Sequence, residues 1–291
     1  MNWDGLVLIN KPGDATSHTV VQMVKQRLGV SKAGHLGTLD PLATGVFPVC
    51  LGRSTRLSPF YMGADKCYIA QVGFGFFTAT DDREGEQEGP RRKPLFSRDQ
   101  LNEAILSFQG EYNQKPPFFS AKKVRGKKAY ELARKGIRPE LAVQKVMIHE
   151  IQLVHYENDA AVIYIHCGSG TYVRSIAREL GTILHCGAHV TELTRTRFSQ
   201  YSVEQTCSPD APIEKLSACF IPIEKMLSHL PEFVIDPELE SKILAGSAIS
   251  IDPRFDQEWV RIFSSENTLL ALAQVETQKD GQRLQPKIVF N

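Results

Sequence analysis

Short runs of apolar or alternating residues recur along this chain, and they limit its fold more than any other feature of the sequence. Most of them are bounded by glycine, proline or other turn residues, which is typical of β-strands. The predicted strands cover residues 5–10, 46–51, 66–75, 145–156, 161–167, 190–197, 259–263, 269–275 and 286–290. We therefore expect the chain to build sheets, with helices between some of the strands.

Fewer segments carry the residues that begin and end helices. Thr16 or Ser17 can accept a free backbone N–H of a helix that runs to Leu28, where Gly29 ends it. Further helices are predicted over residues 97–109, 129–135 and 175–184. The segment 80–92 is polar, acidic and glycine-bearing, so it predicts a surface loop.

The charge of the chain is small in total but uneven along the sequence. The formal net charge is +1. Residues 122–138 hold eight basic side chains against one acid, whereas residues 232–291 hold ten acids against six bases. A partner responds to the local field more than to the total charge. The basic segment is therefore a candidate grip for a polyanion, and the alternative is a solvated surface.

Several classes of chemistry lack their motifs here. The sequence has no phosphate-binding loop, and its paired glycines lack the third glycine of a dinucleotide fingerprint. His149-Glu150 begins a zinc-protease pattern, but Leu153 stands where the second histidine is needed. A second possible metal cluster without an evident fourth ligand consists of His185, Cys186 and His189. We therefore expect no metal, nucleotide or other cofactor.

The cysteines and the N-terminus bear on the cellular compartment. The six cysteines are scattered and form no C-x-x-C pair. No secretory signal is visible, and no apolar run approaches the ~18 residues that a membrane helix needs. Free thiols in a reducing cytosol are then favoured over disulfides. These features predict a soluble cytoplasmic protein without membrane contact.

The most informative segment reads Gly34-His35-Leu36-Gly37-Thr38-Leu39-Asp40-Pro41-Leu42-Ala43-Thr44-Gly45. Its glycines allow the backbone to approach a ligand closely, and it offers one carboxylate and one imidazole. On spacing alone, Asp40-Pro41 would be a helix N-cap followed by proline at the first helical position.

The whole string, however, closely resembles the catalytic motif of the TruB-type tRNA pseudouridine synthases. Other segments resemble further elements of that family in the same order. They are Lys11-Pro12 with Thr16-Ser17, Lys66-Cys67-Tyr68, residues 120–131, residues 170–174 and residues 186–195. Together these segments span residues 5 to about 200.

The resemblance implies an α+β fold in two domains. Residues 1–230 would form the pseudouridine-synthase catalytic domain, a mixed β-sheet with flanking helices and a basic RNA-gripping insertion at about 115–140. Residues 231–291 would form a small β-rich domain of the PUA-like, RNA-binding kind. Residues 208–231 carry four prolines and predict a linker with helical turns between the two.

The resemblance also implies the reaction. The chain would isomerise uridine 55 in the T-loop of tRNA to pseudouridine, flipping the base out and exchanging its C–N glycosidic bond for a C–C bond. Asp40 would be the catalytic carboxylate, because a carboxylate can divide a hard step into easier ones. Attack at C1′, attack at C6 and a glycal route all remain open. The partner would be the tRNA T-arm, and we expect a monomer.

Supporting roles follow from the same resemblance. Arg174 would hold Asp40 in a two-pronged contact and lower its pKa. Tyr68 would stack on the target base, and proton transfer by its phenol is the less secure role. Tyr172 and Leu193 would line the pocket. His35 would insert beside the flipped base, and Lys11 would either support the pocket or contact a phosphate. The residues predicted to contact the RNA backbone are Lys122, Lys123, Arg125, Lys127 and Lys128.

Two other functions need weighing. An RNA chaperone that folds tRNA would use the same basic surface, but it has no need for Asp40, Tyr68 and Arg174 together. An aspartate-dependent hydrolase would want a metal or a second carboxylate, and the glycine-bracketed loop supplies neither. The isomerase is therefore the leading hypothesis.

Overall fold

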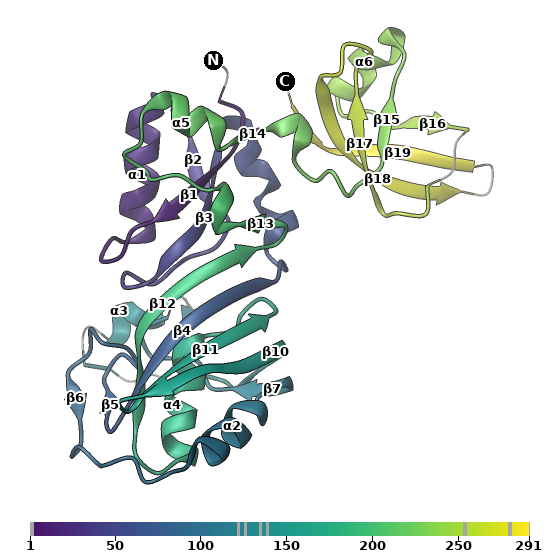
Figure 1. Ribbon diagram of the computed structural model, residues 1–291. Helices are drawn as coiled ribbons and strands as arrows, with labels where there is room; N and C mark the ends of the chain where they lie inside the picture. The colour runs from purple at the N-terminus through teal and green to yellow at the C-terminus, as the bar shows by residue number, and fades with distance from the viewer. Residues whose placement is uncertain are drawn as a thin grey trace.

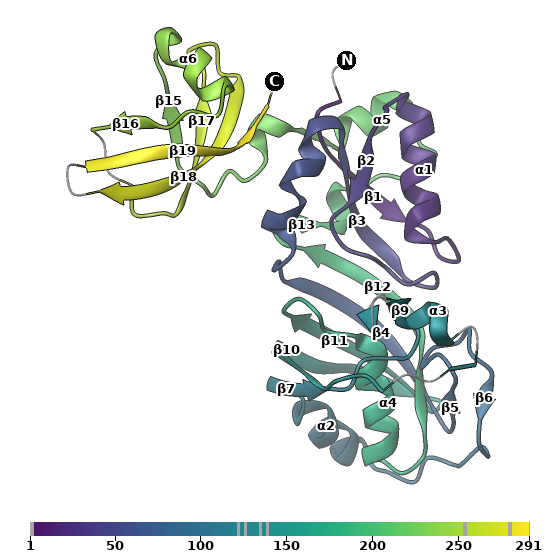
Figure 2. The ribbon, with the colours of Figure 1, turned by 180° about the vertical axis from the view of Figure 1, so that it is seen from behind.

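The computed structural model describes residues 3–120, 123–124, 127–133, 136–137, 140–252, 255–278 and 281–290. A ten-stranded mixed sheet makes up most of the structure, and a separate five-stranded sheet follows it in the chain (Figures 1 and 2). Helices cover parts of both sheets. The predicted α+β class is confirmed.

The large sheet has the order β14-β1-β3-β12-β4-β11-β10-β7, with β13 beside β12 and β2 beside β3. Its strands are β1 (Gly5–Lys11), β2 (Ala33–His35), β3 (Thr44–Leu51), β4 (Lys66–Phe74), β7 (Gly110–Gln114), β10 (Gln144–Glu157), β11 (Ala160–Cys167), β12 (Ala188–Phe198), β13 (Tyr201–Ser202) and β14 (Phe220–Pro222). The second sheet has the order β15-β17-β18-β19-β16. Its strands are β15 (Glu232–Val234), β16 (Ile249–Ile251), β17 (Trp259–Phe263), β18 (Leu269–Gln278) and β19 (Gly281–Val289).

Helices and two short hairpins complete the fold. The helices are α1 (Ser17–Leu28), α2 (Arg98–Leu106), α3 (Ala129–Ala133), α4 (Val173–Ile183), α5 (Ile213–Ala218) and α6 (Pro237–Leu244). The 3₁₀ segments are η1 (Gly52–Tyr61), η2 (Val203–Gln205) and η3 (Ile223–Lys225). The hairpins pair β5 (Phe77–Thr78) with β6 (Gln87–Glu88), and β8 (Lys123–Val124) with β9 (Lys127–Lys128).

A short parallel contact joins the two halves of the large sheet. β3 and β12 pair only at Thr44↔Thr194 and Gly45↔Arg195, and the other described pairs in this sheet are antiparallel. Gly45 has φ +99°, and a Cβ there would lie 2.2 Å from the Arg195 carbonyl oxygen. Only glycine fits this crossing. The loop before it, between β2 and β3, is the glycine-bracketed segment singled out in the sequence.

Most predicted elements form where expected. Thr16 is the N-cap of α1 and accepts a hydrogen bond from the Thr19 amide, while Gly29 ends the helix at φ 64°. Helix α4, however, begins at Val173, two residues before the predicted start, so its first turn carries Arg174. The predicted linker 208–231 is more ordered than expected, because it contributes β14 to the edge of the large sheet beside β1.

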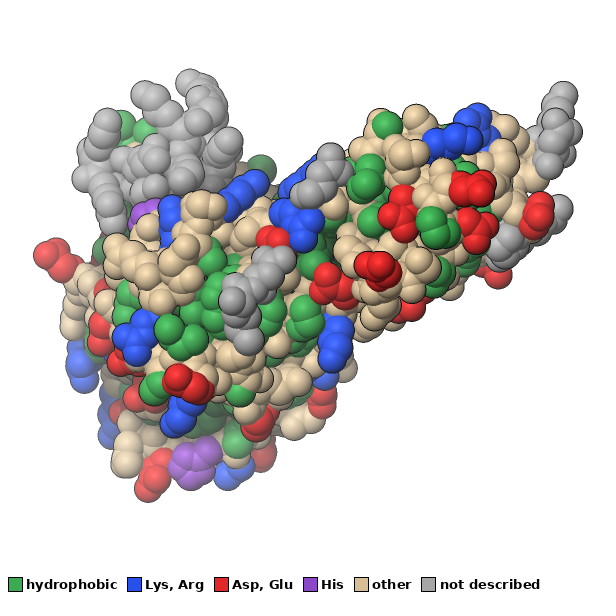
Figure 3. All heavy atoms as spheres, turned by 90° about the horizontal axis from the view of Figure 1, so that it is seen from above, with side chains coloured by type: hydrophobic (Ala, Val, Ile, Leu, Met, Phe, Trp, Pro, Cys, Tyr) green, Lys and Arg blue, Asp and Glu red, His purple; other side chains and the backbone are tan. Residues whose placement is uncertain are grey.

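The C-terminal sheet packs against the rest of the chain through a shared apolar cluster. This cluster joins Leu6 and Leu57 of the N-terminal part to Phe263 and Leu272 of the C-terminal part. The Phe60 ring meets Trp259 edge-on with 4.9 Å between ring centroids. Figure 3 shows the C-terminal part projecting to one side, with acidic side chains prominent on the visible face. Among the described residues, no helix is long and apolar enough to cross a membrane.

Candidate active site

A cleft of about 710 Å³ opens where the glycine-bracketed loop faces the other half of the sheet. Six of the seven predicted pocket residues line it. They are His35, Asp40, Tyr68, Tyr172, Arg174 and Leu193. These side chains come from segments far apart in the sequence, so the fold brings together residues that the sequence presents separately.

Arg174 links two carboxylates at the floor of this cleft. Its Nη2 lies 2.7 Å from Asp40 Oδ1, and its Nη1 lies 3.4 Å from Asp82 Oδ2. The Arg174 and Asp82 side chains are almost fully buried, at 4% and 3% exposure, whereas Asp40 is 28% exposed. Asp40 is therefore the member of this set that a substrate can reach.

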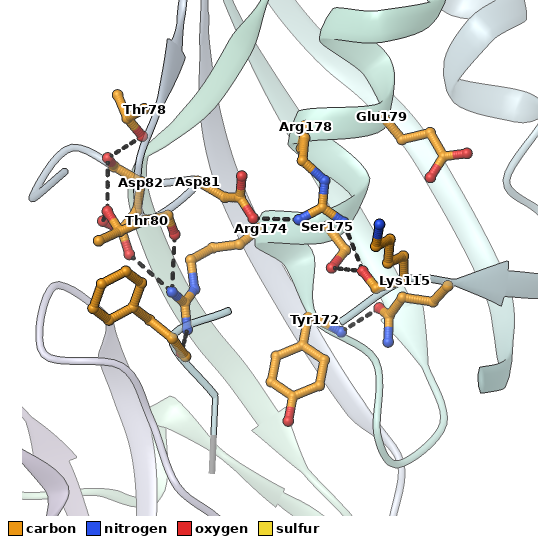
Figure 4. A network of polar contacts seen from close by, with 12 residues as sticks. Thr78, Thr80, Asp81, Asp82, Lys115, Tyr172, Arg174, Ser175, Arg178 and Glu179 are labelled. Carbon is orange, nitrogen blue, oxygen red and sulfur yellow. Dashed lines mark hydrogen bonds and ion pairs between the residues drawn. The ribbon is translucent and has the colours of Figure 1, made fainter. Parts of the chain in front are cut away.

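Backbone carbonyls complete the fixation of Arg174. Its guanidinium also donates to the carbonyl oxygens of Thr80 and Phe119, each at 3.0 Å. Figure 4 shows Arg174 reaching from α4 toward the segment that carries Thr80 and Asp82. One turn further along α4, Arg178 binds the Asp81 carboxylate and the Lys115 carbonyl oxygen. Asp81 and Asp82 thus hold the 80–82 segment against α4 through Arg178 and Arg174. A planar guanidinium with several N–H donors suits such multiple contacts.

The protonation of Asp40 reflects a competition between burial and its cationic neighbour. Burial raises the pKa of the Asp40 carboxyl, the Arg174 guanidinium lowers it, and the Asp82 charge raises it again. Arg174 therefore acts in the expected direction, but burial outweighs it and the pKa of Asp40 lies above its usual value. A raised pKa goes with a carboxylate that is poorly solvated, which favours nucleophilic attack once it is ionised.

Two buried polar side chains hold the loop that presents Asp40. The Lys11 Nζ donates to the carbonyl oxygens of Pro12 at 2.9 Å, Pro41 at 2.9 Å and Ala43 at 2.7 Å. Ser17 Oγ donates to the Leu39 carbonyl oxygen at 2.8 Å and accepts from the Leu39 amide at 2.9 Å.

These contacts bear on the two roles expected of Lys11. Its side chain is fully buried, with all three ammonium protons directed at carbonyl oxygens, which favours support of the pocket over contact with a phosphate. Burial also lowers the pKa of Lys11 to about 8.

Tyr68 and Leu193 present apolar surface on neighbouring strands. They lie on β4 and β12, which pair in the sheet, and both line the cleft. Burial raises the pKa of Tyr68 to about 12, although the Arg195 guanidinium beside it acts in the opposite direction. A phenol with so high a pKa is a poor base at neutral pH. The raised pKa therefore favours contact of the Tyr68 ring with a base over proton transfer, and that role stays a prediction.

Comparison with known proteins bears on these features. A model of the TruB family pseudouridylate synthases, N-terminal domain, matches residues 25–173. A tRNA pseudouridine synthase B of Solibacter usitatus is 38% identical over 280 residues, which is 94% of this chain and 96% of that protein. The chain belongs to the TruB family. A tRNA pseudouridine synthase B of Caldanaerobacter subterraneus is 35% identical over 293 residues and 100% of both chains.

Solved structures extend the TruB likeness to the whole fold. A chain in an H/ACA ribonucleoprotein bound to a substrate RNA containing 2′-deoxyuridine matches with a TM-score of 0.71 and 23% identity, over 99% of this chain and 86% of that one. A chain in a Cbf5-Nop10-Gar1 complex matches with a TM-score of 0.70 and 25% identity, over 99% and 85%. The family resemblance inferred from the motifs is confirmed, and the chain is a pseudouridine synthase.

Tyr172 and His35 both line the cleft of this TruB-family chain. Tyr172 is the N-cap residue of α4, and its amide donates to Gln114 Oε1 at 2.6 Å. Burial raises the pKa of its phenol. The His35 ring lies 5.3 Å from the Phe47 ring, and burial lowers the pKa of His35. A neutral imidazole packed on an aromatic ring is compatible with insertion beside a base, and that role stays a prediction.

The predicted RNA-backbone residues fall only partly within the described structure. Lys122 and Arg125 lie outside the described residues. Lys123, Lys127 and Lys128 lie on the β8–β9 hairpin, in which Lys123 pairs with Lys128. The hairpin leads directly into α3. Phosphate contact by this segment stays a prediction.

Sequence reasoning missed Asp82, and it gave Ser17 and Arg195 no role at the site. The composition around Asp82 predicts a surface loop, but the structure buries this residue against Arg174. Arg195 is 1% exposed and donates to the carbonyl oxygens of Val46 at 2.8 Å and Gly37 at 3.3 Å. The sequence offers only a weak signal for Asp82: two adjacent acids follow Thr78 and Thr80, and two arginines, Arg174 and Arg178, stand four residues apart at the start of the predicted 175–184 helix and within it.

Proposed function

We propose that this TruB-family chain converts uridine 55 in the T-loop of tRNA to pseudouridine, with Asp40 as its catalytic carboxylate. The observation that carries the proposal is Asp40 itself, which lies open to the cleft and bonded to a buried Arg174. The relatives named tRNA pseudouridine synthase B support tRNA as the substrate. We further propose that the chain acts as a monomer in the cytoplasm and that the T-arm is its binding determinant.

The site residues then divide into groups that touch the nucleotide and groups that hold the site. Asp40, Tyr68, Tyr172 and Leu193 would contact the flipped uridine, because all four line the cleft. Lys11 would hold the loop that carries Asp40, through its hydrogen bonds to the Pro41 and Ala43 carbonyl oxygens. Attack at C1′, attack at C6 and a glycal route each use the same carboxylate, so the proposal does not depend on which one operates.

The hydrolase alternative needs a second carboxylate at the reacting atoms. Asp82 is a second carboxylate, but it is buried and its oxygens face Arg174, the Thr80 hydroxyl and the Glu84 amide. Asp82 also borders the cleft, but its side chain is 3% exposed and its carboxylate is already engaged by these three partners. The isomerase therefore fits the site better than a two-carboxylate hydrolase does.

The test compares tritium release from tRNA carrying 5-tritiated uridine by the wild type and by Asp40→Asn. We expect release and pseudouridine in the digest from the wild type alone, with tRNA binding by Asp40→Asn within about tenfold of the wild type. Asp99→Asn is the matched control, because Asp99 is exposed on α2, and it should keep full activity. Tight tRNA binding without release by any form would favour the RNA chaperone, and release of free uracil would favour the hydrolase.

A further inference from the structure

Three side chains with metal-binding atoms meet outside the active-site cleft. Asp65 precedes β4, His149 lies on β10 and His166 lies on β11. Asp65 Oδ1 is 3.3 Å from His149 Nε2, and Asp65 Oδ2 is 3.8 Å from His166 Nε2. One ligand atom from each of the three lies within 4.8 Å of the others. Neighbouring ligands of a tetrahedral Zn²⁺ are roughly 3.3–3.5 Å apart, so small side-chain movements would complete such a site.

A β-bulge directs His149 into this cluster. In the β10–β11 ladder, Ile148 pairs with Cys167 and Glu150 pairs with His166, which leaves His149 as an extra residue. Bulges re-aim side chains, and this one sets the His149 and His166 ring centroids 4.7 Å apart. A regular ladder would have sent neighbouring residues of β10 to opposite faces of the sheet.

Asp65 is also fixed in position. Its carbonyl oxygen accepts a hydrogen bond of 2.8 Å from the Ser199 amide, at the turn after β12. Its carboxylate is about half exposed, at 46%, so it remains open to solvent on the other side. The three side chains therefore come from three segments that the sheet already holds together, and solvent can reach them.

The Arg197 guanidinium already occupies space next to His166 that a metal ion would need. Arg197 Nη2 lies 3.1 Å from His166 Nε2. Arg197 is exposed, so its side chain is able to move away from the ring. Other than Asp65, the acid that faces this ring is Glu150.

We propose that Asp65, His149 and His166 bind a divalent transition-metal cation, for which Zn²⁺ is the fitting case. Two imidazoles and one carboxylate suit Zn²⁺, whereas Mg²⁺ prefers oxygen ligands alone. The sequence pattern did not predict this site, because the partners of His149 are not its neighbours in the chain and come from other strands of the sheet. A bound ion would tie the start of β4, the strand of Tyr68, to β10 and β11.

The test is calorimetric titration of Zn²⁺ into the untagged full-length chain. Cys207→Ser and Cys219→Ser are introduced throughout, because these two partly exposed thiols could bind Zn²⁺ themselves. We expect one Zn²⁺ per chain, no comparable binding of Mg²⁺, and at least about tenfold weaker Zn²⁺ binding in His149→Gln and in His166→Gln. His155→Gln is the matched control, because His155 is an exposed histidine on the same strand, and it should bind as the parent does.

A second variant tests where the ion sits. Arg197→Gln removes the competing charge beside His166, so it should strengthen Zn²⁺ binding. Zn²⁺ should also raise the melting temperature of the parent and of His155→Gln but not that of His166→Gln. Absence of saturable Zn²⁺ binding, or equal affinities in the parent and both histidine variants, would overturn the proposal. An unchanged or lower affinity in Arg197→Gln would contradict the placement of the ion next to His166.

Discussion

Arg174 binds two acidic side chains at once: Asp40, the candidate catalytic carboxylate, and Asp82 of the neighbouring segment. One of its terminal nitrogens faces Asp40 and the other faces Asp82. Asp82 is bonded in turn to the Thr80 hydroxyl and to the Glu84 amide. The orientation of the guanidinium toward Asp40 therefore depends on a second acid, whose side chain is only 3% exposed.

Asp82→Asn tests this dependence. Loss of the charge leaves Arg174 free to turn toward Asp40 in other geometries, and misplacement by ~1 Å can cost about a hundredfold in rate. We expect kcat to fall by roughly ten- to a hundredfold while the Kd for tRNA changes by less than about threefold. Single-turnover kinetics and filter binding measure the two quantities.

Asp14→Asn is the control for Asp82→Asn. Asp14 is an exposed acid that pairs with Arg83, at 3.0 Å. Its loss should leave kcat near the wild-type value. A Kd that rises as much as kcat falls in Asp82→Asn would mean that Asp82 supports RNA binding and does not position Arg174.

The sequence predicted Asp40 and Arg174 because each lies in a continuous motif. Asp82 has no such motif around it, and its polar, glycine-bearing surroundings favour an exposed loop. What buries it is a contact with a residue 92 positions later in the chain. Local composition does not reveal a contact over such a separation in sequence, so the burial of Asp82 could be recognised only from the structure.

At the scale of elements, the crossing of β3 and β12 fixes how the catalytic loop meets the rest of the site. The pairing is short and parallel, and Gly45 lies against the backbone of Arg195 with no room for a side chain. Thr44 Oγ1 and Thr194 Oγ1 are 2.8 Å apart at the same point. The loop that ends here carries Asp40, so the crossing places this carboxylate opposite α4.

Gly45→Ala should therefore destabilise the protein strongly. The new Cβ would meet the Arg195 carbonyl oxygen and would also force a positive φ on alanine, for a total of roughly 2–4 kcal/mol in the free energy of unfolding. Gly29→Ala is a matched control, because Gly29 also has a positive φ but nothing lies within 4 Å of its Cβ position. It should cost only about 1 kcal/mol. Urea unfolding measures both, and equal destabilisation would refute a close approach at Gly45.

Elements with strong patterns were predictable, and weak ones were not. The period-two apolar pattern located β10 and β11 within one residue at each end. β7 is short and largely polar, with the sequence GEYNQ, and it exists because it pairs with β10. The proline of β14 favoured a linker, yet Pro222 ends an edge strand, where a missing N–H is tolerated.

The whole molecule separates a positive segment from a negative part. The C-terminal sheet is joined to η1 by the apolar cluster around Phe263, and its buried cation Arg261 is directed at Glu232 and at backbone carbonyls. Residues 232–291 carry more acids than bases, whereas residues 122–138 are strongly basic. Attraction for the phosphates of an RNA should therefore arise mainly from the basic segment, with the C-terminal sheet contributing shape more than charge.

This separation predicts how RNA binding responds to salt. Each lysine that no longer neutralises a phosphate should reduce the slope of log K against log salt concentration by about 0.7–0.9. The double change Lys127→Ala and Lys128→Ala should therefore lower the slope by roughly 1.4–1.8 and weaken tRNA binding most at low salt. The control is the double change Lys242→Ala and Arg283→Ala, which removes the same charge from the acidic C-terminal part and should leave the slope nearly unchanged. Filter binding over a salt series measures both slopes. Equal effects of the two double variants would show that RNA binding responds to the total charge of the protein and that the basic segment is not the RNA-binding site.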